Sequence, residues 1–297
     1  MASNGKDKGN GRWAERERCY SVGGRIARER MRQETPLGDQ ALRRVEASDI
    51  VVVEGCYDQV QLVLGALELP HTSIQADQLG QARLGPDQLL VINCPGHVPG
   101  RVLPRIRDFV ERGGSLFTTD WALRHVLEPA FPGLVEFNER PTADDVVRIE
   151  VKSGDNAFLR GVLDDGDDPQ WWLEASSYPI RVLDPERVEV LITSRELKER
   201  YGEAPVAVLI RYGQGEIFHM VSHYFLQRTD LRNARHQQTA AAFAEEKGVL
   251  LEPQLQATAV GLSLGDVESA AASSRWLANI VADKKRKALE RPSRRPR

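Results

Sequence analysis

The sequence predicts an α/β fold, in which helices flank a mostly parallel sheet and antiparallel strands extend that sheet in the second half of the chain. Short unbroken apolar runs such as LLVI at residues 89–92 are typical of strands buried on both faces. By contrast, VVRIEV at 146–151 and RVEVLIT at 187–193 alternate apolar and polar residues. That alternation is typical of half-exposed antiparallel strands.

The parallel strands lie in the first half of the chain. We predict them at IVVV (50–53), HTSIQA (71–76), LLVI (89–92) and LFTT (116–119). A helix joins the last two, because Ile106, Phe109 and Val110 form one apolar stripe and Gly113 follows as a helix stop. Strands joined by one crossover helix run parallel, so their carboxyl ends meet at the same edge of the sheet.

The second half begins with the two alternating strands and continues with a hairpin. VAVLI at 206–210 and EIFHMV at 216–221 flank a tight turn and lead to His223. Helices are expected at 232–246 and 267–287. The segment PQWWLEASSYP at 169–179 has two tryptophans bounded by prolines, and we interpret it as an ordered loop lying over the sheet edge.

Charge divides the chain into three parts. Residues 1–45 hold 11 Lys/Arg and 6 Asp/Glu (+5), and residues 284–297 hold 8 and 1 (+7), so the net charge of −3 leaves −15 for the middle. We therefore expect one α/β domain over 46–283, a basic and partly disordered segment over 1–45, and a basic disordered tail over 284–297. Such ends could contact an acidic surface or nucleic acid, or simply aid solubility.

Several classes of protein are not expected. No apolar run approaches the roughly 18 residues of a membrane span, and the first residues lack the apolar core of a signal peptide. We therefore expect a cytoplasmic protein with no membrane contact. The three cysteines, Cys19, Cys56 and Cys94, fit neither a disulfide framework nor a CxxC zinc site.

Candidate catalytic residues follow from the shared carboxyl edge. Cys94 follows the third strand, Asp120 follows the fourth, and His223 follows the hairpin. Cys94 could act as a thiolate nucleophile if His223 lowered its pKa. Asp120 with His223 could instead activate water. A cysteine just beyond an apolar strand can also be a small buried hydrophobic residue.

Other residues at this edge are candidate ligand-binding groups. Asn93 and Thr119 are the neighbours of Cys94 and Asp120, Glu54 and Tyr57 follow the first strand, and Trp121 could form a wall. These groups suit a small polar ligand. Near Tyr57, Asp58 could bind the ligand or cap the helix that follows.

Neither a metal nor a cofactor is expected from these patterns. His219 and His223 are four residues apart, but on a strand this spacing separates them by roughly 13 Å, too far for one ion. Trp171 and Trp172 could stack on a sugar or a base. Packing in the core or anchoring of a lid is the alternative interpretation.

A family resemblance rests on two segments, FVERGGSLFTTDWA at 109–122 and YGQGEIFHMVSHYF at 212–225. Together they resemble the class I glutamine amidotransferase-like superfamily, in particular its trehalose-utilisation-like branch. The resemblance covers 50–225 and implies a flavodoxin-like sheet. In true amidotransferases the strand after Gly-Gly ends in a Gly-x-Cys-x-Gly elbow, whereas residues 118–122 here read TTDWA.

The missing elbow implies that glutaminase activity is absent. The leading interpretation is a non-glutaminase amidotransferase-like domain that binds a small polar ligand or a protein partner at the carboxyl edge of its sheet. One alternative is a hydrolase that uses Cys94 or Asp120 with His223. Another is a non-catalytic subunit of a larger assembly, docked through the basic ends.

Overall fold

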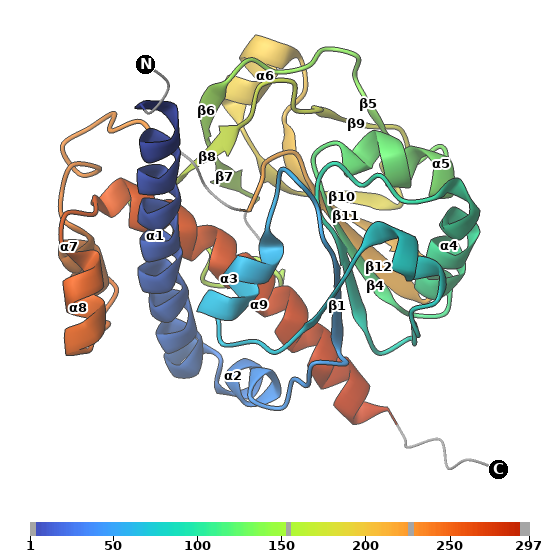
Figure 1. Ribbon diagram of the computed structural model, residues 1–297, viewed down its shortest axis with the longest axis horizontal. Helices are drawn as coiled ribbons and strands as arrows, with labels where there is room; N and C mark the ends of the chain where they lie inside the picture. The colour runs from blue at the N-terminus through green and yellow to red at the C-terminus, as the bar shows by residue number, and fades with distance from the viewer. Residues whose placement is uncertain (1–3, 153–155, 225–228, 292–297) are drawn as a thin grey trace.

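The structure is a computed structural model that describes residues 4–152, 156–224 and 229–291. Its main sheet has eight strands in the order β2-β1-β3-β4-β12-β11-β10-β7. Figure 1 shows α1, α3 and α9 on one side of this sheet and α4 and α5 on the other. This arrangement confirms the predicted α/β class.

Five neighbouring strands are parallel: β2 (Thr72–Ile74), β1 (Ile50–Val53), β3 (Leu89–Ile92), β4 (Ser115–Thr119) and β12 (Gly215–Met220). The remaining three are antiparallel: β11 (Pro205–Tyr212), β10 (Val188–Thr193) and β7 (Glu150–Val151). Every residue of β1, β3 and β4 is buried. The unbroken apolar runs therefore mark central strands, as predicted.

Helices cover both faces of the sheet. The α-helices are α1 (Asn4–Glu34), α2 (Pro36–Leu42), α3 (Val60–Ala66), α4 (Leu103–Glu111), α5 (Glu128–Ala130), α6 (Arg195–Tyr201), α7 (Ala240–Glu246), α8 (Pro253–Ala259) and α9 (Leu264–Glu290). Two short 3₁₀ turns, η1 (Ala76–Gly80) and η2 (Gly100–Val102), and a π-helical turn, η3 (Leu123–Leu127), complete the set. Among the described residues, every helix is too short or too polar to cross a lipid bilayer.

The tryptophan pair lies in a strand, which corrects the predicted loop. Two small antiparallel sheets stand beside the main one: β5 (Val135–Phe137) with β9 (Ile180–Val182), and β6 (Asp145–Arg148) with β8 (Gln170–Leu173). Trp171 and Trp172 belong to β8 and are 2% and 6% exposed. Most of the strand predicted at 146–151 pairs with β8, so only β7 joins the main sheet.

The described part of the N-terminal segment is largely helical. Helix α1 spans Asn4–Glu34 and packs against α9, which crosses it at an angle (Figure 1). Cys19, Tyr20, Val22 and Ile26 are buried in the common core, and this apolar face outweighs the basic composition of the segment.

The first residues of the C-terminal segment, as far as Glu290, are helical as well. Helix α9 continues through the first residues of the predicted tail, and the Lys284 amine is buried while it donates to the carbonyls of Pro86 and Gly113. The predicted disorder of 292–297 falls outside the described residues. The domain boundaries at 46 and 283 stay a prediction.

The helix predicted at 232–246 is shorter than expected. Helix α7 begins only after Thr239, whose side chain accepts a hydrogen bond from the Ala242 amide, and the residues before it are irregular. Helix α9 begins three residues earlier than predicted, at Leu264. Ser263 caps it by accepting from the Asp266 amide.

An aromatic cluster joins α9 to the sheet. Trp276 is fully buried, and its ring lies edge-on to Phe117 of β4 at 5.3 Å between centroids and stacks on Tyr224 at 6.3 Å. Replacing Trp276 with alanine should lower the free energy of unfolding by about 3–5 kcal/mol, because the cavity cannot fully collapse. Chemical denaturation measures this.

The matched control for this substitution is Leu250→Ala. Leu250 is 91% exposed, so its replacement should change the free energy of unfolding by no more than about 0.5 kcal/mol. Equal effects of the two substitutions would contradict the assignment of Trp276 to the core.

Candidate functional site

Asp120 forms the turn between β4 and the π-helical turn η3. Its backbone φ is +44°, a left-handed conformation that is uncommon for a residue other than glycine. Its backbone amide donates to the Met220 carbonyl of β12 at 2.8 Å, which fixes the turn against the neighbouring strand. The side chain, 1% exposed, is thereby directed into the protein at the carboxyl edge of the sheet.

The Asp120 carboxylate accepts hydrogen bonds from a loop that lies across it. The Tyr178 amide donates to Oδ1 at 2.8 Å, and the Ser177 hydroxyl donates to Oδ2 at 3.1 Å. The Trp121 indole donates to the Ser176 carbonyl at 2.6 Å and ties the same loop to the turn. The second half of the predicted loop, residues 174–179, therefore does lie over the sheet edge.

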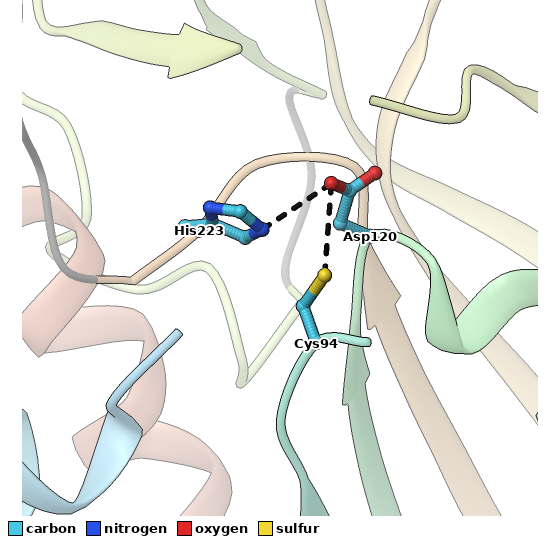
Figure 2. Close-up of side chains that lie close together, drawn as sticks. All are labelled: Cys94, Asp120 and His223. Carbon is cyan, nitrogen blue, oxygen red and sulfur yellow. Dashed lines mark hydrogen bonds and ion pairs between the residues drawn. The ribbon is translucent and has the colours of Figure 1, made fainter. Parts of the chain in front are cut away.

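Cys94 approaches the same carboxylate from the end of β3. Its sulfur is 3.9 Å from Asp120 Oδ2, and its backbone amide donates to Thr119 Oγ1 at 3.0 Å. The peptide bond between Cys94 and Pro95 is cis, and the cysteine is 1% exposed. Figure 2 shows Cys94 and His223 on different sides of Asp120, both facing one carboxylate oxygen.

His223 lies between two carboxylates. Its Nε2 is 3.2 Å from Asp120 Oδ2 and its Nδ1 is 3.0 Å from Glu174 Oε2, while the imidazole is only 2% exposed. These distances are those of ion pairs, yet among the described residues neither ring nitrogen makes a hydrogen bond of good geometry. The ring therefore lies close to both carboxylates without being locked to either of them.

Burial and the neighbouring charges shift all three pKa values. Burial opposes a charged His223, but contacts with Asp120, Cys94 and Glu174 outweigh it and raise the His223 pKa well above 6.5. Burial raises the pKa of Asp120, while His223, Tyr178 and Ser177 oppose that shift. Burial raises the pKa of the Cys94 thiol to about 11, so the thiol is protonated at neutral pH.

The structure therefore brings together the three residues predicted to be catalytic, within 4.8 Å of one another. Two predicted ligand-binding residues beside them make hydrogen bonds to other parts of the protein. Asn93 is buried, accepts from the Val60 amide and donates to Gln61 Oε1. Thr119 is also buried and accepts from the Cys94 amide.

The other predicted ligand-binding residues lie outside this centre. Tyr57 is 47% exposed, and its ring lies edge-on to Trp121 at 5.3 Å. The Trp121 ring in turn stacks on Tyr178 at 5.6 Å, so these aromatic rings form one wall.

Glu54 is exposed and contacts Gln75. Asp58 is buried and accepts from the Gln59 and Tyr224 amides, which ties the end of β1 to the segment after β12.

His219 does not take part in the centre. It lies within β12 with no exposed surface, and its Nδ1 is 2.8 Å from Thr118 Oγ1. Burial lowers its pKa to about 3. The structure thus places only His223 of this histidine pair at the edge of the sheet.

Sequence reasoning missed three residues of the centre, Glu174, Ser177 and Tyr178. All three belong to the loop after β8, and they reach Asp120 or His223 only because β8 pairs with β6 away from the main sheet. The signal in the sequence was the segment as a whole, PQWWLEASSYP at 169–179, which we expected over the sheet edge without assigning a role to these three residues.

No protein-family model matches the sequence, and the comparison with curated proteins gives no match. Among solved structures, PurLQS from Thermotoga maritima shares 14% identity, with 83% of this chain and 99% of that chain covered and a TM-score of 0.47. A putative GMP synthase component from Thermoplasma acidophilum shares 13%, with 63% and 87% covered and a TM-score of 0.43.

Longer enzymes also align. An exo-β-1,4-mannosidase from Opitutaceae bacterium strain TAV5 shares 13% identity, with 84% of this chain and 38% of that chain covered and a TM-score of 0.45. The chain spans about a quarter of a similar GH42 β-galactosidase. Identities below 25% and TM-scores below 0.5 do not establish a shared activity.

The raised pKa of His223 gives a direct test. Ring-nitrogen NMR of wild type dialysed against a chelator should show that His223 keeps its second proton to a higher pH than a free imidazole does. Asp120→Asn should lower the His223 pKa, because burial alone favours the neutral ring. His219, neutral throughout, is the internal reference.

The direction in which folding stability changes with pH follows from the same raised pKa of His223. A raised folded-state pKa adds stability that is complete below about pH 6.5 and is lost as the pH rises through the folded value. A His223 that titrates identically in wild type and Asp120→Asn would contradict the contact.

Proposed function

We propose that this chain is an amidotransferase-like domain without glutaminase activity that hydrolyses a small polar substrate at the carboxyl edge of its sheet. The observation that supports this most strongly is the meeting of Asp120 Oδ2 and His223 Nε2 at 3.2 Å in a buried centre. Of the resemblance, the proposal includes the class I glutamine amidotransferase-like superfamily and leaves out its trehalose-utilisation-like branch.

The flavodoxin-like part of this proposal rests on strand order. The parallel strands follow one another as β2-β1-β3-β4-β12, and a flavodoxin-like sheet has the order 2-1-3-4-5. In such sheets ligands bind beyond the carboxyl ends of strands near the point where the order reverses. That point lies between β1 and β3, and Cys94 lies two residues beyond the end of β3.

Asp120 replaces the nucleophile of an amidotransferase in position and in backbone conformation. It sits at a strand-to-helix turn with positive φ, the strained geometry of a nucleophile elbow. A carboxylate there does not perform thiolate attack on an amide. Cys94, one strand away, is a neutral thiol with a raised pKa, which argues against a resting thiolate nucleophile.

An acid–base pair is the chemistry that remains. Below the raised pKa of His223 the imidazolium can donate a proton to a leaving group, while the ionised Asp120 can accept one from water. Burial strengthens both effects, because the local dielectric is low. The Glu174 side chain is 32% exposed whereas that of His223 is 2% exposed, so a substrate would approach the pair from the side of Glu174.

The alternative of a non-catalytic component of a larger assembly has less support than the composition suggested. It requires basic ends that are free to dock, but residues 4–34 and 284–290 are helical, and α1 places Cys19, Tyr20 and Ile26 in the core. The Lys284 amine, for example, donates hydrogen bonds to the backbone carbonyls of Pro86 and Gly113.

The test is a hydrolysis assay with p-nitrophenyl acetate and p-nitrophenyl phosphate. Asp120→Asn should lower the rate on the substrate that wild type cleaves by about 10²–10⁴-fold, because the proton acceptor is lost. Asp108→Asn, on the exposed face of α4, should leave the rate unchanged. Ammonia release from L-glutamine should stay at background.

Three results would contradict the proposal. These are no turnover of either nitrophenyl substrate by wild type, an unchanged rate in Asp120→Asn, or glutamine-dependent ammonia that Cys94→Ser abolishes. Circular dichroism of each variant checks that the fold is retained.

A further inference from the structure

The centre contains three side chains of the types that bind transition metals. Cys94 Sγ, Asp120 Oδ2 and His223 Nε2 lie within 4.8 Å of one another, at 3.2 Å for nitrogen to oxygen and 3.9 Å for sulfur to oxygen. Tetrahedral zinc with bonds of about 2.0–2.3 Å places neighbouring ligands roughly 3.3–3.6 Å apart. The sulfur–oxygen and nitrogen–oxygen separations are within a few tenths of an ångström of these values. The sulfur–nitrogen separation, which lies within 4.8 Å, has to shorten by up to about 1 Å for the three atoms to share one ion.

The groups behind these atoms have the arrangement of an outer ligand shell. Metal-bound histidine commonly donates its other ring N–H to a carboxylate, and Glu174 Oε2 lies 3.0 Å from His223 Nδ1. The Tyr178 amide holds Asp120 Oδ1, which turns Oδ2 toward Cys94 and His223. Figure 2 shows both side chains facing that oxygen.

An independent observation is the state of the imidazole. His223 is 2% exposed at its side chain, and among the described residues its Nε2 has only the ion-pair contact with Asp120 Oδ2 at 3.2 Å and no hydrogen bond of good geometry. A buried polar group without such a bond costs free energy, so a native structure that keeps one calls for an explanation. A metal at Nε2 supplies the missing interaction.

We propose that Cys94 Sγ, Asp120 Oδ2 and His223 Nε2 bind one Zn²⁺ ion, with a fourth position open to water. Three protein ligands and one open position are typical of catalytic rather than structural zinc. Its catalytic meaning rests on the proposed function, because zinc would lower the pKa of a bound water and make it a nucleophile at neutral pH. In the zinc-bound state this water would take the place of the Asp120–His223 acid–base pair in the hydrolysis.

Binding must release protons. The Cys94 thiol loses its proton to become a thiolate ligand, and His223 loses the proton on Nε2, so each ion displaces up to two protons. Affinity should therefore fall as the pH is lowered. No sequence pattern indicates this set, because its members are 26 and 103 residues apart and match no spaced ligand motif.

The experiment uses the full chain after dialysis against a chelator. Titration with Co²⁺, followed by absorption, should give a thiolate-to-cobalt charge-transfer band and visible d–d bands that saturate at one ion per chain. Zn²⁺ should displace this signal at the same stoichiometry. Cys94→Ser should abolish the charge-transfer band, whereas Cys56→Ser, which changes an exposed cysteine, should keep it.

A positioning variant extends the test to the outer shell. Glu174→Gln should weaken Zn²⁺ binding about 10–100-fold yet retain the Co²⁺–thiolate band, because it changes the orientation and basicity of His223 and removes no ligand. His223→Gln and Asp120→Asn should each weaken binding further. Circular dichroism shows whether every variant is folded.

The inference is overturned if wild type binds no Co²⁺ at one per chain, or if folded Cys94→Ser gives an unchanged band. It is also overturned if hydrolysis by chelator-treated protein equals that of zinc-loaded protein. Metal binding with no hydrolysis of any probe would instead leave the zinc site standing and count against the proposed activity.

Discussion

The contact between Asp120 and His223 is the constraint on which the carboxyl edge depends. A carboxylate that is 1% exposed is costly to bury unless cations and hydrogen-bond donors surround it. Asp120 accepts hydrogen bonds from the Tyr178 amide and the Ser177 hydroxyl, and it forms an ion-pair contact with the His223 imidazole. Removing the imidazole would leave a buried negative charge with neutral donors alone.

This requirement explains how distant parts of the chain meet. β4 delivers Asp120, the segment after β12 delivers His223, and the loop after β8 covers both with Ser177 and Tyr178. The positive φ of Asp120 points its side chain inward rather than along the helix that follows. The same geometry places Cys94 against the shared oxygen, so an acid–base pair and a ligand set are formed by the same atoms.

Much of the parallel core could be predicted, because apolar runs such as LLVI at 89–92 leave a strand few alternatives. The convergence of Cys94, Asp120 and His223 followed from that topology. Helix α1 and strand β8 could not be predicted. The basic composition of α1 gave no clear indication of its apolar face. The strand β8 depends on pairing with β6, which the sequence pattern does not indicate. Glu174 was missed for the same reason, since its place depends on β8.

A double-mutant cycle tests the central claim most directly. Unfolding free energies of wild type, Asp120→Asn, His223→Gln and the double variant, measured by denaturant titration at pH 7, give the coupling between the two side chains. A coupling of at least about 1.5 kcal/mol is predicted for this buried charged pair. Additive effects within about 0.3 kcal/mol would show that the two side chains do not interact.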